Sequence, residues 1–268
     1  MSSLFDLTGR VAVVIGGTSG LGRAIALGLA QHGAAVVASG RRLEAVLDTA
    51  AAIESFGGRT LRVQVDVNFR ESIDGLRDSV TGAFGRIDIL VNAAGITSKK
   101  PTVEVSEEEW CSLTGTNLNG VLRACQSMYA PLKASGRGRI INIASLASFV
   151  AFHEVAAYAA SKSAVLSLTR SLACEWARDG IAVNAIAPGV FPTGLNSHLL
   201  EGTARGRELL MRTPMARFGR PEEVVGQIAA ASMGVAGKCL PPGVDRRAGE
   251  ILQLNIADPD TCAVPGRG

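Results

Sequence analysis

Short apolar segments alternate with longer amphipathic segments over most of the chain. The apolar segments are rich in Val and Ile and carry hydrophobic side chains at consecutive positions, which is typical of strands buried on both faces of a parallel sheet. A later candidate strand, near the C-terminus, covers residues 250–254. The other predicted strands are residues 11–15, 35–39, 61–65, 87–91, 140–144 and 181–186.

The segments between these strands have the spacing of amphipathic helices, as at residues 21–32 and 43–56. Ser106 is followed by three glutamates, and Glu109 at the third helical position completes a capping-box pattern that predicts the start of a long helix. Another helix is predicted over residues 156–176. Alternation of this kind predicts an α/β fold with a doubly wound, mostly parallel sheet and right-handed crossovers.

Composition and charge indicate which kinds of binding partner the protein lacks. The net charge of +3 is too small to favour nucleic acid or an anionic membrane. No apolar run approaches the ~18 residues of a membrane span, and the first residues lack the pattern of a signal peptide. The five cysteines are scattered, which indicates reduced thiols and no zinc site. We therefore expect a cytoplasmic protein with no metal, nucleic-acid or membrane partner.

The first predicted strand ends in a glycine-rich turn that opens a helix. Gly16 permits the tight turn, Gly20 lets the backbone approach a pyrophosphate, and Gly22 lets the helix pack close to the strand. Free N–H groups at the helix N-terminus then favour phosphate binding. The pattern predicts a dinucleotide site formed by Gly16, Thr18, Ser19, Gly20, Leu21 and Gly22.

The residues after the second strand bear on the choice of nucleotide. NAD sites usually place an acidic residue here to bind the adenosine ribose, and none is present. Arg41 and Arg42 occupy these positions instead. Arginine binds phosphate through charge-assisted, bidentate hydrogen bonds, so the pair favours NADP(H) over NAD(H).

Tyr158 and Lys162 lie four residues apart in a predicted helix, so that the phenol and the ammonium share one face. A nearby cation favours the phenolate and is expected to lower the pKa of a tyrosine. Such a pair is suited to exchange a proton with a carbinol oxygen.

These motifs together resemble the short-chain dehydrogenase/reductase family over roughly residues 5–235. Besides the glycine turn and the Tyr–Lys pair, the matching residues are Asp66, Val67, Asn92, Ala93, Ala94, Gly95, Asn117, Ser145, Pro188, Gly189 and Thr193. The resemblance implies an oxidoreductase built as one Rossmann-type domain with a mostly parallel seven-stranded sheet flanked by helices. We expect that domain to cover residues 1–257, and the Pro- and Gly-containing residues 258–268 to form a flexible tail.

The resemblance also implies a role for each residue. Ser145 would polarise the substrate oxygen, and Tyr158 would act as general acid/base. Lys162 would lower the pKa of Tyr158 and bind the nicotinamide ribose, while Asn117 would hold a water that links Lys162 to solvent. The remaining residues would contact the cofactor: Asp66 and Val67 at the adenine, Asn92, Ala93, Ala94 and Gly95 beside the sheet, and Pro188, Gly189 and Thr193 at the nicotinamide.

The substrate is expected to be a small carbonyl or alcohol compound. Residues 5–9 and 188–193 resemble gluconate 5-dehydrogenase and related sugar-acid dehydrogenases. The alternative is a 3-oxoacyl-(acyl carrier protein) reductase, although Ala130 and Cys174 stand where basic residues would meet the carrier protein. A non-catalytic NADP(H)-binding sensor is a more distant alternative. Residues 146–155 and the loop after Pro188 would line the substrate pocket, and residues 194–217 would include a mobile lid over it.

The C-terminal part departs from the family pattern from about residue 236. The family usually ends with a strand followed by Val-Asp-Gly-Gly, and this chain offers only partial matches. The long helices over residues 106–134 and 158–176 could bury apolar faces between subunits. We expect a homotetramer, with a dimer as the alternative.

Overall fold

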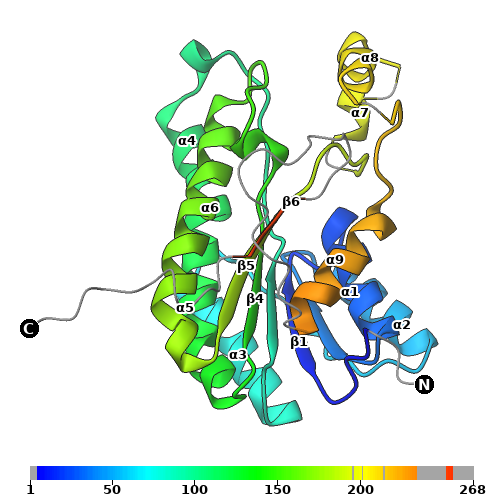
Figure 1. Ribbon diagram of the computed structural model, residues 1–268, viewed down its shortest axis with the longest axis vertical. Helices are drawn as coiled ribbons and strands as arrows, with labels where there is room; N and C mark the ends of the chain where they lie inside the picture. Colours follow the sequence, from blue (N-terminus) through cyan, green and yellow to red (C-terminus); the bar gives the residue numbers. More distant parts are fainter. Residues whose placement is uncertain (1–4, 195, 201, 214, 234–251, 256–268) are drawn as a thin grey trace, which may run out of the picture.

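The computed structural model describes residues 5–194, 196–200, 202–213, 215–233 and 252–255. Two layers of helices enclose a twisted sheet (Figure 1). The strands are β1 (Val11–Ile15), β2 (Ala35–Ser39), β3 (Ile89–Asn92), β4 (Arg139–Ile143), β5 (Ala182–Ala187) and β6 (Leu252–Asn255). The α-helices are α1 (Gly20–Gln31), α2 (Leu43–Ser55), α3 (Arg70–Phe84), α4 (Glu107–Thr114), α5 (Gly120–Ala134), α6 (Ala156–Trp176), α7 (Ser197–Leu200), α8 (Ala204–Met211) and α9 (Val225–Met233).

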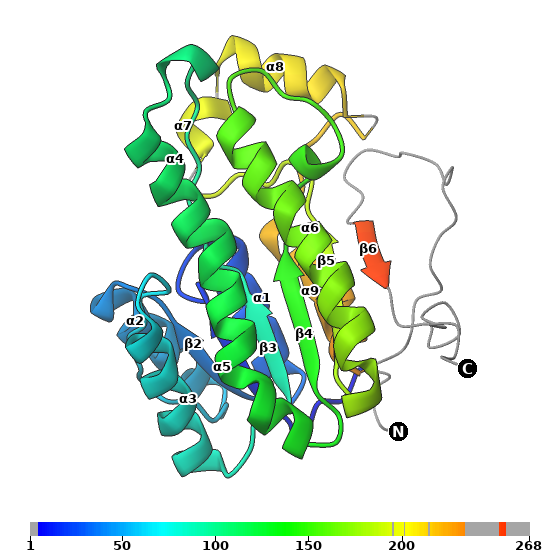
Figure 2. The same cartoon turned by 90° about the vertical axis from the view of Figure 1, so that its left-hand side faces the viewer.

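The sheet has the order β2-β1-β3-β4-β5-β6 within the described residues. The first five strands are parallel, and β6 pairs antiparallel with β5. The order reverses direction between β2 and β3, so the fold is doubly wound as predicted. The parallel strands run towards the end of the molecule where α4, α7 and α8 lie (Figure 2). That end is the carboxyl edge, where ligands bind in open α/β sheets.

Both faces of the sheet are covered. In β1, Val11, Val13 and Ile15 pack into the core on the side of α3, α5 and α6. Ala12 and Val14 pack into a second core, on the side of α1 and α9. Successive strand residues point to opposite faces, so a strand covered on both sides must be apolar throughout. This explains the consecutive hydrophobic positions.

The strand count differs from the expected seven, because six strands belong to the sheet among the described residues. Residues 61–65 run beside β2 without joining its ladder. They are flanked by two backbone hydrogen bonds, from Val36 N to Arg59 O (2.9 Å) and from Val65 N to Gly40 O (3.1 Å). The segment therefore contacts β2 near its ends and does not pair along its length. The C-terminal strand was predicted near its observed place, and its antiparallel direction was not.

A buried carboxylate joins the amino ends of three strands. Asp88, just before β3, has no exposed surface. Its Oδ2 accepts from Val11 N and Arg86 Nε, both at 2.9 Å, and its Oδ1 accepts from Arg137 Nε at 3.0 Å. Burial raises the pKa of this carboxyl, but hydrogen bonds from Arg86, Val11 and Arg137 outweigh burial, and the pKa lies below its usual value. Asp88 N also donates to Val11 O, and Asp88 O accepts from Arg139 N.

The predicted capping box is confirmed, since Ser106 Oγ accepts from Glu109 N and Glu109 Oε2 accepts from Ser106 N. The helix that it starts is not uniform. A π-helical turn, η2 (Gly115–Asn119), separates α4 from α5. Single π turns are rare and often occur at functional sites. None of the helices in the described part of the chain is long and apolar enough to cross a membrane.

Candidate active site

The glycine-rich turn lies at the carboxyl end of β1, as predicted. Gly16 has φ +83°, and both Gly16 N and Gly17 N donate to Ser39 O, which ties the turn to the end of β2. A Cβ at Gly16 would overlap the backbone of Ala94, and one at Gly22 would overlap Gly16 O. The backbone is therefore as close-packed here as a dinucleotide turn requires.

Helix α1 begins directly after this turn. Its N-cap, Ser19, makes no capping bond through its side chain within the described residues, which leaves the first N–H groups of the helix available. Leu21 is the second residue of the helix. A Cβ at Gly20 would lie 3.2 Å from the side chain of Thr193, so the loop after β5 passes over the turn. Free N–H groups at a helix N-terminus beside a glycine turn are the kind of arrangement that can accept an anion.

The two arginines follow the end of β2. A Cβ at Gly40 would lie 2.6 Å from Thr18 Oγ1, so the phosphate turn and the residue before Arg41 are in contact. The Arg41 and Arg42 side chains are exposed, and neither forms a salt bridge in the part of the chain that the structure describes. Their guanidinium groups are therefore available to a phosphate beside the turn.

Asp66 and Val67 lie further along the carboxyl edge of the sheet. Asp66 Oδ1 accepts from both Asn68 N and Asn68 Nδ2 at 2.9 Å. Val67 is buried, and a Cβ at Gly120 would lie 2.8 Å from its side chain. Asn68 in turn accepts a long hydrogen bond from Thr116 Oγ1 at 3.5 Å. Residues 66–68 are thus linked to the π turn.

The last residue of β3 and the three residues after it lie near the centre of the sheet. Asn92 Nδ2 donates to Asn142 Oδ1 at 2.8 Å, which fixes the end of β3 to β4. Ala93 N donates to Ile15 O, and Ala94 packs on Gly16. A Cβ at Gly95 would lie 3.3 Å from Asn117 Oδ1 and 3.5 Å from Lys162 Nζ. Gly95 therefore lies between these two polar groups.

Tyr158 and Lys162 occupy the first two turns of α6, as predicted. Lys162 is 5% exposed, and its Nζ donates to Ile143 O at 2.7 Å. The same Nζ lies 6.0 Å from the centre of the Tyr158 ring. Ser145 comes two residues after β4, faces the Tyr158 hydroxyl, and accepts from Ala147 N at 3.1 Å. The structure therefore brings Ser145, Tyr158 and Lys162 together.

Burial is the largest influence on the pKa values of Tyr158 and Lys162. Burial raises the pKa of Tyr158, and hydrogen bonding with Ser145 opposes that shift without cancelling it. Burial lowers the pKa of Lys162 to about 8. Lys162 is not among the causes of the Tyr158 shift, and the lowering of that pKa by Lys162 stays a prediction. The ammonium is directed at Ile143 O, and loss of solvent is the larger effect on the phenol.

Asn117 lies in the π turn and is fully buried. Its Oδ1 accepts from Ile96 N at 2.8 Å, and its Nδ2 donates to Ile96 O at 2.9 Å and to Ser161 Oγ at 3.0 Å. The side chain thus joins the loop after β3 to helix α6. Ser161 was not singled out from the sequence, although it lies three residues after Tyr158, on the same helix face.

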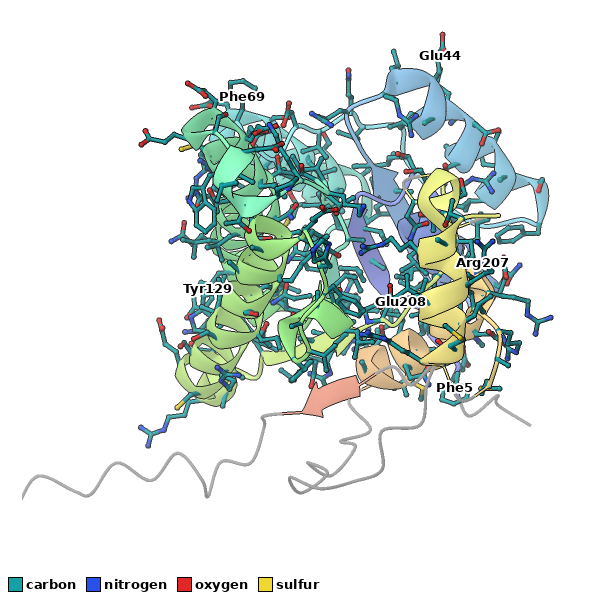
Figure 3. All side chains as sticks on the ribbon, turned by 90° about the horizontal axis from the view of Figure 1, so that it is seen from above. Phe5, Glu44, Phe69, Tyr129, Arg207 and Glu208 are labelled. Carbon is teal, nitrogen blue, oxygen red and sulfur yellow. The ribbon has the colours of Figure 1, made fainter. Side chains whose placement is uncertain are left out.

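The segments predicted to line the substrate pocket lie above the sheet. Pro188 O accepts from Leu146 N at 2.9 Å, which links the two segments. Thr193 N donates to Asn196 Oδ1 at 2.8 Å. Viewed from above, α8 with Arg207 and Glu208 lies across the molecule from α5 (Figure 3). The predicted lid therefore contains the short helices α7 and α8.

A salt bridge lies in the first of the segments predicted to line the substrate pocket. Glu154 adopts φ +62°, which is uncommon for a residue other than glycine, and its carboxylate pairs with Lys99 Nζ at 2.8 Å. Its backbone oxygen accepts from Lys100 N. His153 beside it is mostly exposed, in keeping with an ordinary loop histidine.

Comparison with known proteins gives consistent results. A model of the short chain dehydrogenase family matches residues 10–204. The chain is 40% identical over 227 residues to 2-dehydro-3-deoxy-D-gluconate 5-dehydrogenase of Escherichia coli, covering 84% of this chain and 89% of that protein. It is 38% identical over 224 residues to gluconate 5-dehydrogenase of Gluconobacter oxydans, covering 83% and 87%.

Among solved structures, the chain resembles a gluconate 5-dehydrogenase from Burkholderia cenocepacia in complex with NADP and tartrate. The TM-score is 0.81 at 36% identity, and the match covers 85% of this chain and 89% of that one.

Proposed function

The chain belongs to the short chain dehydrogenase family, and we propose that it is an NADP(H)-dependent oxidoreductase that interconverts a secondary alcohol and a ketone on a sugar acid or polyol. The observation that carries the proposal is the cluster of Ser145, Tyr158 and Lys162 at the carboxyl edge of the sheet. The glycine turn, which fits a pyrophosphate, lies along the same edge.

The chain's residues fit a bound dinucleotide. The α1 N-terminus and the turn of Gly16, Gly20 and Gly22 would hold the pyrophosphate, and Arg41 and Arg42 would bind the 2′-phosphate. The adenine would lie against Asp66 and Val67. Asn92, Ala93, Ala94 and Gly95 would flank the cofactor, and Lys162 would bind the nicotinamide ribose. Pro188, Gly189 and Thr193 would bound the nicotinamide end. When bound, the nicotinamide supplies or accepts the hydride.

Side chains of the protein transfer the proton. In the proposed mechanism Ser145 donates a hydrogen bond to the substrate oxygen, and Tyr158 exchanges a proton with that oxygen. Because burial raises the pKa of Tyr158, the phenol is protonated at neutral pH and ready to protonate a ketone being reduced. In the oxidation direction, the ammonium of Lys162 would help the phenol to lose its proton.

The substrate class is supported by the relatives. Two of them are named as dehydrogenases of gluconate or of a deoxygluconate, and tartrate, a hydroxy diacid, accompanies NADP in a related structure. The preference for NADP rests on Arg41 and Arg42. The carrier-protein reductase is less favoured, because Ala130 and Cys174 offer no cation to an acidic partner. A homotetramer built on the α5 and α6 faces remains our expectation for the assembly.

Steady-state kinetics test the proposal. NADPH and NADH oxidation would be followed with 5-ketogluconate, other keto-sugar acids and an acetoacetyl thioester. We expect the keto-sugar acids and NADPH to be preferred. Tyr158→Phe should abolish turnover and leave NADPH binding nearly unchanged. A variant that kept most of its rate would show that Tyr158 is not the acid/base, and a protein that binds NADPH but reduces nothing would favour a sensor.

A further inference from the structure

Two buried hydroxyls of α6 make the same pair of hydrogen bonds. Ser161 Oγ accepts from Asn117 Nδ2 at 3.0 Å and donates to Tyr158 O at 2.7 Å. Two turns further along, Thr169 Oγ1 accepts from Asn142 Nδ2 at 2.9 Å and donates to Val165 O at 2.7 Å. Both residues are at most 1% exposed. The two differ in what they hold. Ser161 bonds directly to Asn117 and Tyr158 of the candidate site, whereas Thr169 bonds to Val165 and to Asn142, which lies one bond away from Asn92.

Both amide hydrogens of the Asn117 side chain are used within the protein. They go to Ile96 O and Ser161 Oγ, and the side-chain oxygen accepts from Ile96 N. The side chain sets the distance between the loop after β3 and helix α6.

We propose that Ser161 is a positioning residue for the reaction, whose hydroxyl holds the Asn117 amide and the first turn of α6, which carries Tyr158, in one fixed arrangement. This inference rests on the proposed function. Ser161 does not face the substrate. It acts through Asn117 and through the backbone oxygen of Tyr158.

The consequence of losing this hydroxyl follows from the packing. Without it, the Asn117 amide is a buried donor that lacks one acceptor, which is unfavourable unless the side chain moves. Asn117 Oδ1 and Lys162 Nζ both lie beside Gly95, at 3.3 Å and 3.5 Å from the position of a Cβ there. A displaced Asn117 would therefore remove a partial negative charge from beside the ammonium. No charged side chain of the described residues contributes to the pKa shift of Lys162, and Tyr158 is the titratable group near it.

The test compares Ser161→Ala with Thr169→Val, which removes the matching hydroxyl. Both variants should lose similar stability in urea. Only Ser161→Ala should lower kcat, by about 10-fold, and shift the pH of half-maximal alcohol oxidation, with the KM for the nucleotide nearly unchanged. Ser161→Cys, a smaller perturbation, should lie between. Equal losses of kcat in Ser161→Ala and Thr169→Val, with unshifted pH profiles, would overturn the proposal.

A second measurement needs no turnover. The chain has two tyrosines, Tyr129 and Tyr158, so a Tyr129→Phe background leaves one phenol whose ionisation is followed by tyrosinate absorbance. We expect Ser161→Ala to move this titration and Thr169→Val to leave it in place. If no substrate of the panel is turned over, the proposed function fails, and this titration alone decides whether Ser161 positions Tyr158. Identical titrations in both variants would refute that.

Discussion

Replacing Lys162 with Met should stabilise the fold at neutral pH while it abolishes turnover. Lys162 is buried, and burial lowers its pKa from 10.5 to about 8. In the unfolded chain the ammonium is in water and keeps its ordinary pKa. Folding a charged Lys162 therefore costs free energy that a methionine of similar length does not incur.

The magnitude and its pH dependence follow from linkage. The gap between 10.5 and about 8 corresponds to about 3 kcal/mol of unfavourable free energy. Below about pH 8 both states are protonated and the cost is complete. It declines as the pH rises from about 8 towards 10.5, because the folded state has lost its proton, and it vanishes above that range. The hydrogen bond to Ile143 O, which Met lacks, offsets about 1 kcal/mol at every pH.

Urea denaturation of the unaltered chain and Lys162→Met, at about pH 7 and about pH 9.5, measures this difference. Lys162→Met should be more stable by roughly 2 kcal/mol at the lower pH, and by less than about 1 kcal/mol at the higher pH. Lys133→Met is the control. Hydrogen bonding to Asp179 raises the pKa of this exposed lysine, so its removal should bring no stabilisation at either pH. A stability difference for Lys162→Met that stays constant with pH would refute the reasoning.

Three further predictions concern the frame of the site. Asp88→Asn should cost about 3–5 kcal/mol in urea denaturation, and because the pKa of Asp88 lies below its usual value, its contribution should persist until the pH falls below about 4. Gly28→Ala should lower the free energy of unfolding by about 1–3 kcal/mol in thermal scans, because its Cβ would overlap Val225 of α9. Changing Arg41 and Arg42 together to Ala should raise the KM for NADPH by about 10-fold or more and leave that for NADH nearly unchanged; equal effects on both would remove the basis for the NADP preference.

The parts of the fold that hydrophobic periodicity determines were predictable from the sequence. The bounds of β1, β2 and α6 agree with the prediction to the residue, since consecutive apolar positions and an uninterrupted helical spacing define them. The segment at residues 61–65 has the same composition as a strand, but strand pairing depends on a partner, and β2 bonds to it only near its ends. The direction of β6 has no local signal either.

The residues of the candidate site were predictable from the sequence, but the interactions between them were not. A motif places Tyr158 and Lys162 on one helix face, but their pKa values depend on how much water the fold removes. The π turn around Asn117 also escaped prediction, because its residues differ little from those of an ordinary helix. Ser161 could be linked to the site only once its hydrogen bond with Asn117 was known.

The arginine-surrounded carboxylate of Asp88 has a consequence for motion. It closes one border of the sheet, where β1, β3 and β4 begin, through backbone and side-chain bonds together. The opposite border is joined by neutral hydrogen bonds, such as that from Asn92 Nδ2 to Asn142 Oδ1, and has no buried carboxylate of this kind among the described residues. Local opening should therefore increase along each strand from its amino end to its carboxyl end. Backbone amides should exchange with solvent most slowly near Asp88 and fastest beside the glycine turn.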